Sequence, residues 1–165
     1  MPIRAAQPDD LERVVEIYNA AIPDRLATAD TEPVSVAARQ TWFRDFNPEN
    51  RPLWVFDGGR GDPVDGWLGL RSFYGRPAYR ATVEVGVYID PVAQRRGLAR
   101  TLLAHAVAAA PGLGVRTMLG FIFAHNTPSL ALFARAGFLQ WGLLPAVAEL
   151  DGIERDLAIV GRRVG

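Results

Sequence analysis

The sequence predicts one mixed α/β (α+β) domain over residues 1–165, with a mostly antiparallel central sheet flanked by helices. Three observations predict it. Hydrophobic residues recur with helical spacing in some segments and with strand spacing in others. Strand-like segments cluster in the first half of the chain, which favours antiparallel pairing there. No linker, internal repeat or low-complexity tract divides the chain. At 165 residues, 49% of them hydrophobic, the chain can bury one substantial core.

Composition excludes several classes of function. Lys+Arg and Asp+Glu each number 18, so no basic surplus favours a nucleic acid partner. The absence of cysteine excludes disulfides, zinc-thiolate sites and a thiol nucleophile. The N-terminal ten residues are charged where a signal peptide is apolar, and apolar stretches are broken well short of a membrane span. We therefore expect a cytoplasmic protein that binds neither nucleic acid nor membrane.

Two helices are predicted in the N-terminal third. Pro8 suits the first turn of a helix over about 8–22, in which apolar residues recur at helical spacing. Ser35 can cap a second helix, which ends at Asn47-Pro48. The aromatic residues of this region and of the strand that follows are predicted to lie in the core: Trp42, Phe43 and Trp67.

Strands then take over. Residues 53–56 and 64–73 read as strands on either side of a turn-rich hairpin loop at 57–63. Residues 82–89 alternate, so that one face carries Val83, Val85, Val87 and Ile89 and the other carries Thr82, Glu84, Gly86 and Tyr88. We expect the first face to lie in the core and the second to line a cleft.

The C-terminal half alternates helices with strands. A helix with an apolar stripe follows Gly97 and stops at Pro111-Gly112, and residues 115–123 form a buried strand. A short helix follows, with Pro128 at its first position and Gly137 after its end. Strands are predicted last, over 138–144 and 153–160.

The segment 94–99 has the features of an anion cradle. Gly97 removes a Cβ where a ligand approaches the backbone, and the helix that follows begins with unpaired N–H groups that attract phosphate. Arg95 and Arg96 add positive charge at the rim. An ordinary strand-to-helix turn with solvated arginines is the alternative interpretation. The chain has neither GxxxxGK[ST] nor GxGxxG, which leaves a pyrophosphate of another kind.

Two short motifs in the second half of the chain resemble those of a known family. Gln94-x-x-Gly97-x-Ala99, which follows the strand that holds Glu84, resembles the acetyl-CoA signature of the GNAT N-acetyltransferases. Asn126-x-x-Ser129, with Phe133 and Gly137-Phe138, resembles their downstream helix motif. The segments 3–22, 32–43 and 76–91 are similar to the branch that acetylates phosphinothricin and methionine sulfone or sulfoximine. The resemblance spans nearly the whole chain and implies a GNAT fold.

The resemblance also implies a co-substrate, acetyl-CoA, held where the strands 82–89 and 115–123 splay apart. The resemblance implies that the backbone at Val87, Tyr88 and Ile89 pairs with the pantetheine arm. It also implies that Asn126 and Ser129 contact the far side of this arm. The pyrophosphate is held by the amides of Gln94, Arg95, Arg96, Gly97, Leu98 and Ala99. Relatives are dimers, so we expect a homodimer. No metal is implied.

Glu84 is the candidate catalytic base, because a carboxylate on an apolar strand can have its pKa raised toward neutrality. The alternative is a structural carboxylate paired with Arg71 or Arg80. Many relatives supply a tyrosine as the acid for the departing thiolate, but Phe133 stands at that position. Either a hydroxyl such as that of Tyr88 or Tyr79 helps, or the thiolate leaves without a dedicated acid.

The acceptor site implied by the resemblance lies just before the Glu84 strand and comprises Arg71, Phe73, Tyr74, Tyr79 and Arg80. An arginine there can clamp a carboxylate or phosphinyl oxygen, although a polar hairpin with aromatic packing explains the same residues. We predict an enzyme that acetylates a small amino-acid-like amine. A GNAT that acetylates a peptide, protein or other amine, and a non-catalytic acyl-CoA-binding module, remain as alternatives.

Three further residues bear on these predictions. Arg155 takes the place of a histidine in the branch; arginine cannot act as a base at neutral pH, but it can bind an anion. His105 and His125 are predicted to be surface residues. With only two histidines and no cysteine, neither a metal site nor a Ser-His-Asp triad can be assembled.

Overall fold

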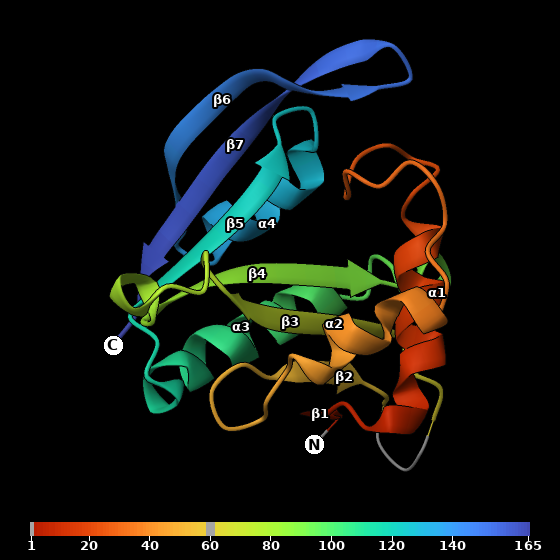
Figure 1. Ribbon diagram of the computed structural model, residues 1–165, viewed down its shortest axis with the longest axis vertical. Coiled ribbons are helices and arrows are strands. Elements are labelled where there is room, and N and C mark those ends of the chain that lie inside the picture. The colour runs from red at the N-terminus through yellow and green to blue at the C-terminus, as the bar shows by residue number, and fades with distance from the viewer. Residues whose placement is uncertain (1, 59–61) are drawn as a thin grey trace.

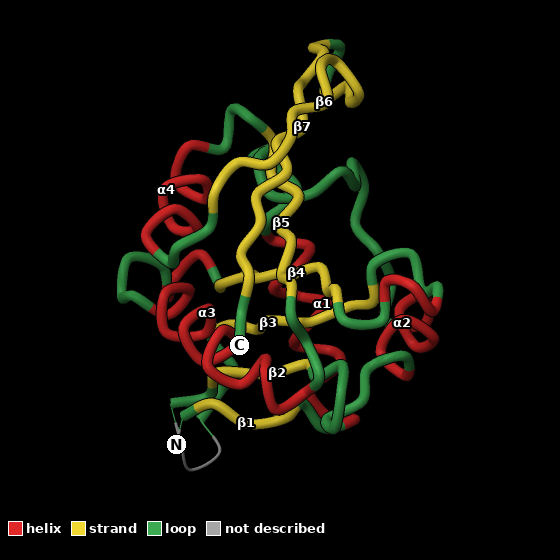
Figure 2. Tube along the Cα trace, turned by 90° about the vertical axis from the view of Figure 1, so that its left-hand side faces the viewer, coloured by secondary structure: helices red, strands yellow, loops and turns green. Residues whose placement is uncertain are grey.

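The computed structural model describes residues 2–58 and 62–165, which form a seven-stranded sheet with helices on both faces (Figures 1 and 2). The strand order is β1-β2-β3-β4-β5-β7-β6, and among these pairs only β4 and β5 run parallel. The strands are β1 Ile3–Ala5, β2 Leu53–Phe56, β3 Gly66–Ser72, β4 Thr82–Ile89, β5 Thr117–Phe123, β6 Leu139–Leu150 and β7 Ile153–Arg163. The α-helices are α1 Leu11–Ala20, α2 Gln40–Arg44, α3 Leu98–Ala109 and α4 Thr127–Arg135. The predicted mixed sheet is confirmed.

Several boundaries differ from the prediction. The strand β1 was not predicted, because three residues are too few to show a periodicity. The predicted second helix is a 3₁₀ turn over Ala37–Arg39 followed by the short α2. Val36 and not Ser35 is the N-cap of this turn, although the Oγ of Ser35 accepts the N–H of Ala38 at 3.1 Å. Strand β6 continues to Leu150 through two register shifts that blur its alternation. The predicted hairpin joins the antiparallel β2 and β3, but residues 59–61 of its loop lie outside the described residues.

Each face of the sheet has its own core. In Figure 2, α3 and α4 lie on one side of the sheet and α1 and α2 on the other. Val83 and Val85 of β4 pack with α3, as the alternation predicts. The opposite face is a second core rather than an open surface, because Tyr88 and Trp67 pack there against α1, and Trp42 and Phe43 complete it. The predicted core role of Trp42, Phe43 and Trp67 is confirmed.

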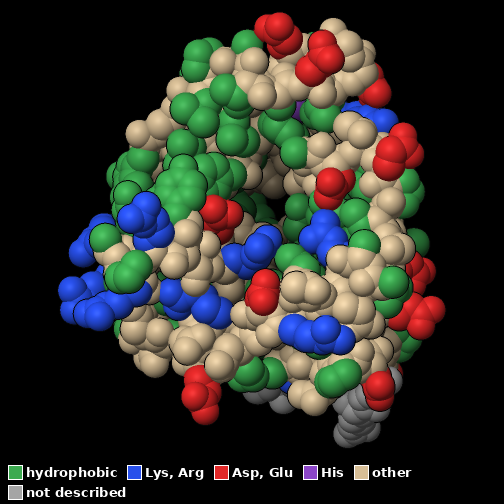
Figure 3. All heavy atoms as spheres, in the orientation of Figure 1, with side chains coloured by type: hydrophobic (Ala, Val, Ile, Leu, Met, Phe, Trp, Pro, Cys, Tyr) green, Lys and Arg blue, Asp and Glu red, His purple; other side chains and the backbone are tan. Residues whose placement is uncertain are grey.

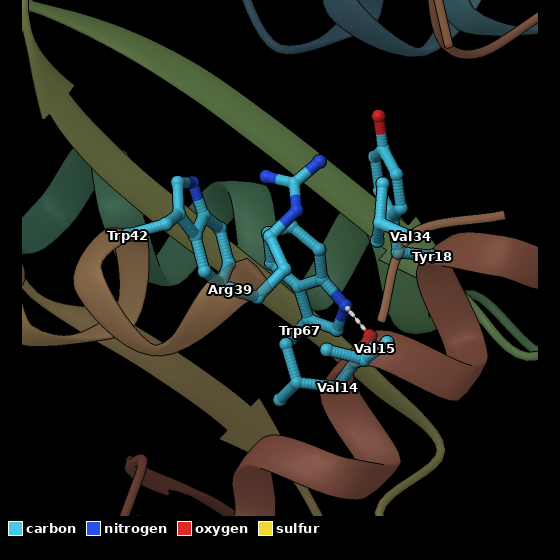
Figure 4. A pocket seen from close by; sticks show the side chains of 7 residues that line it. All are labelled: Val14, Val15, Tyr18, Val34, Arg39, Trp42 and Trp67. Carbon is cyan, nitrogen blue, oxygen red and sulfur yellow. Dashed lines mark hydrogen bonds between the residues drawn. The ribbon is translucent and has the colours of Figure 1, made fainter. Parts of the chain in front are cut away.

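A small cavity lies within this second core (Figure 4). Trp67 donates its indole N–H to the carbonyl of Val14 at 3.1 Å, and the guanidinium of Arg39 lies over the rings of Tyr18 and Trp42, 4.6 and 5.1 Å from their centroids. The space that remains is about 10 Å³, room for one water at most. This cavity therefore is a packing feature and holds no substrate.

Across the described residues, no helix combines the length and the apolar character that a membrane crossing needs.

Candidate active site

The two parallel strands at the centre of the sheet separate after three residues. Register between β4 and β5 runs only from Thr82 opposite Thr117 to Glu84 opposite Leu119. Beyond this point β4 continues to pair with β3 as far as Ile89, and β5 continues to pair with β7 as far as Phe123. The divergence is visible in Figure 1. The edge of β4 at 85–89 that faces β5 is therefore left with unpaired backbone groups, as the predicted splay requires.

Glu84 lies where the strands separate. Its side chain points to the α1–α2 side of the sheet, the side on which Tyr88 lies four residues further along β4. The Glu84 side chain is half-buried. Burial raises the pKa of the Glu84 carboxyl, and the charge of Arg71, directly opposite on β3, lowers the same pKa to a smaller extent. Among residues 2–58 and 62–165 no arginine forms an ion pair with Glu84 within 4 Å. The ion pair with Arg71 or Arg80 on which the alternative depends is therefore not formed in the described part of the chain, although the charge of Arg71 still acts on the carboxyl.

Changing Arg71 to Gln is expected to raise the pKa of Glu84, because it removes the one charge that lowers it. A base works only when ionised, so the acid limb of the profile of kcat/KM against pH should move to higher pH. The measurement is that profile, compared with the profile of Arg76→Gln, which removes another exposed arginine, in the loop that follows β3. If the acid limb does not move, or moves to lower pH, the assignment of Glu84 as the base is contradicted.

The predicted cradle follows the other end of β4, where Ile89 lies about 17 Å from Glu84 by strand geometry. Gly97 is the N-cap of α3 and has φ +76°, and no protein atom lies within 4 Å of where its Cβ would be. No side chain caps α3, so its first N–H groups remain available to an anion. Leu98 is 6% exposed and packs in the core, so it can offer only its backbone N–H.

One of the two arginines at the rim of the cradle is held in an ion pair. Arg96 forms an ion pair of 3.3 Å with Asp65, whereas Arg95 is exposed and has no ion-pair partner in the described part of the chain. Arg95 adopts φ +65°, so the backbone turns through the left-handed region twice within three residues. Gln94 is exposed beside them and Ala99 is half-buried in the first turn of α3. The structure thus gathers residues 94–99 around one helix terminus.

Asp90 fixes the end of β4 and was missed by the sequence reasoning. Its Oδ1 accepts the N–H of Val92 at 2.9 Å, and its Oδ2 forms an ion pair with Arg13 of α1. Arg13 also donates to the carbonyl of Val64 at 2.9 Å. The hydrogen bond from Val92 and the ion pair with Arg13 lower the pKa of the Asp90 carboxyl. The sequence does carry a signal for this role, namely an aspartate directly before a proline at the end of a strand. Aspartate favours such positions because its side chain can accept a hydrogen bond from the backbone N–H two residues on.

Three side chains hold the segment after α1 across the opening between β4 and β5. Three consecutive carbonyls each accept one hydrogen bond: Arg25 from Nε2 of His125 at 2.8 Å, Leu26 from Nδ2 of Asn126 at 3.2 Å, and Ala27 from the hydroxyl of Tyr88 at 3.1 Å. Arg25 also forms an ion pair of 3.0 Å with Asp151 in the β6–β7 turn. This segment, residues 25–27, bridges both splayed strands.

These contacts change the roles expected from sequence. His125 is half-buried and holds the bridging segment rather than lying free on the surface, and His105 packs its ring edge against Trp54, with 4.7 Å between ring centroids. Asn126 is 6% exposed; its Oδ1 accepts the N–H of Ser129 at 3.3 Å as the N-cap of α4. Both histidines are therefore half-buried, each with a contact to another element, where the prediction gave them a plain surface role.

The candidate acids for thiolate departure differ in their surroundings. Burial raises the pKa of the Tyr88 hydroxyl, so it stays protonated at neutral pH, but it already donates to Ala27. Tyr79 is exposed. Phe133 is 3% exposed and its ring meets Phe138 edge-on, 4.9 Å between centroids. That position therefore contributes packing between α4 and β5 and no acid.

The residues predicted to bind the acceptor form an aromatic group beside the splay. The ring of Phe73 contacts Tyr74, Tyr79 and Phe121 at centroid distances of 4.3, 5.3 and 6.3 Å. Figure 3 shows that the molecule is hollowed on this side, above β4 and between β5 and the segment after α1, with hydrophobic side chains along one wall. Arg80 is exposed, and its carbonyl accepts a hydrogen bond from Arg51 at 2.5 Å. The structure brings the aromatic residues together as expected.

Comparison with known proteins gives a consistent result. The model of the acetyltransferase (GNAT) family matches residues 12–138. A Bacillus subtilis (strain 168) protein named "Putative phosphinothricin acetyltransferase YwnH" is 48% identical over 99% of each chain. A Pseudomonas aeruginosa L-methionine sulfoximine/L-methionine sulfone acetyltransferase is 30% identical over 96% of this chain and 91% of its own. The crystal structure of a phosphinothricin acetyltransferase from Sinorhizobium meliloti in complex with AcCoA superposes with a TM-score of 0.92, at 31% identity, over 100% of this chain and 90% of that one.

Proposed function

The chain belongs to the acetyltransferase (GNAT) family, and on that premise we propose that it transfers the acetyl group of acetyl-CoA to the amine of a small amino-acid-like substrate. The observation that carries the proposal is the position of Glu84, a half-buried carboxylate of raised pKa at the point where β4 and β5 separate. A base at that point is close to both an open strand edge and a hollow. The relatives named above support the substrate class.

Acetyl-CoA fits the residues that surround the splay. The free backbone edge at Val87, Tyr88 and Ile89 can pair with the amides of the pantetheine arm. The N–H groups of 94–99 can hold the pyrophosphate at the N-terminus of α3, where Gly97 leaves open space. Asn126 and Ser129 close the far side as part of the α4 N-terminus. Acetyl-CoA supplies an activated thioester when bound.

Glu84 performs the proton transfer that amine acetylation needs. An ammonium has no lone pair, so the carboxylate takes its proton, directly or through one water. The free amine forms a C–N bond with the thioester carbonyl while the C–S bond breaks, and the proton that the nitrogen then loses passes to the departing sulfur, in direct transfer within a ternary complex. The thiolate is a good leaving group, and with Phe133 at the usual tyrosine position it departs without an acid from α4. The aromatic residues at 73, 74 and 79 cover the acceptor.

The proposal is tested by following free thiol release from acetyl-CoA with a panel of acceptors. The panel contains phosphinothricin, methionine sulfone, methionine sulfoximine, ordinary amino acids, polyamines and a peptide. Saturable release with one of the first three supports the proposal. Turnover of the peptide or the polyamines alone contradicts the acceptor class. Binding of acetyl-CoA without turnover of any amine contradicts catalysis and leaves an acyl-CoA-binding module.

We also propose that two copies associate through β6, the outer strand of the sheet. In the part of the chain that the structure describes, no further strand lies beside β6. Large apolar side chains are exposed along the β6–β7 hairpin: Leu139, Trp141, Leu143, Leu144, Val147 and Ile153. An exposed apolar edge strand is costly for a monomer, because it can pair with other chains. The β6 strand of a second copy would supply hydrogen-bond partners for the backbone edge and would cover the apolar side chains.

Changing Val147 to Glu is therefore expected to convert the dimer to a monomer, because a charge would be buried at the contact. Val147 is 56% exposed in the single chain, so the substitution leaves the fold intact. The measurement is molar mass by light scattering after size-exclusion chromatography. Val92→Glu, at a side chain that is 88% exposed away from β6, is the matched control. A dimer that survives Val147→Glu, or a wild-type monomer, contradicts this interface.

A further inference from the structure

A second pocket is lined by Arg71, the residue opposite Glu84 in the register of β3 and β4. It has a volume of about 300 Å³ and lies between the end of α2 and the end of β3. Its lining comprises Asp45, Phe46, Arg51, Leu70, Arg71 and Ser72. The volume is at the lower limit for small-molecule sites, which suits one functional group and a short aliphatic stem.

Arg51 is held rigidly in this pocket by neutral oxygens. Its Nε donates to Oγ of Ser72 at 2.9 Å, Nη1 to the carbonyl of Asn50 at 2.7 Å, and Nη2 to the carbonyl of Arg80 at 2.5 Å. The backbone is fixed as well, because the N–H of Leu70 donates to the carbonyl of Pro52 at 3.0 Å. Three of the five N–H donors are thus used, which leaves two for a ligand.

The positive charge of Arg51 has no counter-ion among residues 2–58 and 62–165. No carboxylate lies within 4 Å of its guanidinium in the described part of the chain, and burial lowers its pKa. Asp45 lines the same pocket, but its side chain is exposed and pairs with neither arginine. A half-buried cation held only by neutral groups favours the entry of an anion.

Arg71 connects this charge to the reacting centre. It lies directly opposite Glu84 in the register of β3 and β4, and its guanidinium has no hydrogen bond or ion pair among the described residues. A group bound between the two arginines would therefore lie beside Glu84. The cradle lies at the opposite end of β4, so an anion bound in the cradle is too far away to contact Arg51 or Arg71.

We propose that Arg51 and Arg71 form an anion subsite that binds the acidic group of the acceptor and directs its amine to Glu84. This inference rests on the proposed function and narrows its substrate class to amines that carry a carboxylate or another acidic group. Arg51 sets this preference as a binding residue, and its anchoring by Ser72 and the Arg80 carbonyl preorganises it. Neutral derivatives of the same amines would leave two cations unpaired in the pocket.

The test compares L-methionine sulfone with its carboxamide, which differs in the acidic group alone, as acceptors for the wild type and for Arg51→Gln. Loss of a charge-assisted hydrogen bond should lower kcat/KM for the acid by about 10- to 100-fold and change kcat/KM for the carboxamide little. Arg44→Gln, an exposed arginine of α2 outside the pocket lining, is the control and should change neither value. Thermal unfolding verifies that both variants fold. Equal losses for acid and carboxamide would overturn the proposal.

Calorimetry separates this inference from the proposed function, because it measures binding of the same two compounds without acetyl transfer. Tighter binding of the acid than of the carboxamide by the wild type, with the difference lost in Arg51→Gln, supports the subsite even if no compound is acetylated. A wild type that shows no preference for the acid overturns the subsite, whatever its turnover.

Discussion

Changing Glu84 to Gln is expected to lower kcat by about 100- to 10,000-fold, the range over which a general base contributes. Glutamine keeps the size and a hydrogen-bonding oxygen but cannot accept the proton of the ammonium. The affinity for acetyl-CoA should stay within about twofold, because the predicted cofactor contacts lie beyond Glu84 along β4 and at α3. The measurements are kcat by thiol release and the Kd of acetyl-CoA by calorimetry.

The matched control for this variant is Glu12→Gln. Glu12 is exposed in the first turn of α1 and forms no ion pair in the part of the chain that the structure describes, so the same chemical change should leave kcat unaltered. The residual activity of Glu84→Gln should also lose the acid limb of the pH profile. Equal losses of kcat and of acetyl-CoA affinity, or no loss at all, would show that Glu84 is not the base.

Changing Gly97 to Val is expected to weaken acetyl-CoA binding by 100-fold or more, to about the level of non-specific binding. The backbone at Gly97 has φ +76°, which costs a β-branched residue about 1–2 kcal/mol, so the turn should relax toward negative φ and turn the N–H groups of 94–99 out of position. The new side chain would also project into the open space that the pyrophosphate needs. The measurement is the Kd of acetyl-CoA.

Gly114 supplies a control at the other end of the same helical region. It has φ +76° and ψ +16°, against φ +76° and ψ +14° at Gly97, and its added Cβ likewise meets no atom within 4 Å. Gly114→Val should therefore lose a similar amount of stability without loss of acetyl-CoA affinity. If both variants lose affinity equally, the effect of Gly97→Val is one of stability and the cradle assignment is wrong.

Features that depend on neighbours in the chain were predictable. The alternation of 82–89 identified a strand with Glu84 on the face opposite the valines, and the structure places Val83 and Val85 with α3 and Glu84 on the α1–α2 side. Gly97 at the start of a helix was recognisable because only a residue without Cβ adopts positive φ freely. Strand β1 escaped prediction because its stability comes from pairing with β2 and not from its own three residues.

Features that depend on distant residues were not predictable. His125 and Arg25 are 100 positions apart, and Arg51 and Arg80 are 29 apart, and in neither case does a local pattern announce the hydrogen bond. The same holds for Asp90, whose partner Arg13 is 77 positions away. A histidine on a helix or in a turn reads as exposed until a neighbour such as Trp54 or Arg25 is known to cover it.

The sequence by itself determined the order of the helices and strands after β1, the face on which Glu84 lies, and the backbone turn at Gly97, because periodicity and the absence of a Cβ act within a few residues. Only the tertiary structure decided where along their length β4 and β5 separate and that residues 25–27 are tied to both strands. It also decided that Arg51 and Arg71 line one pocket, with no counter-ion to Arg51 among the described residues. The physical reason is that the burial and charge of a side chain are set by the elements that fold against it.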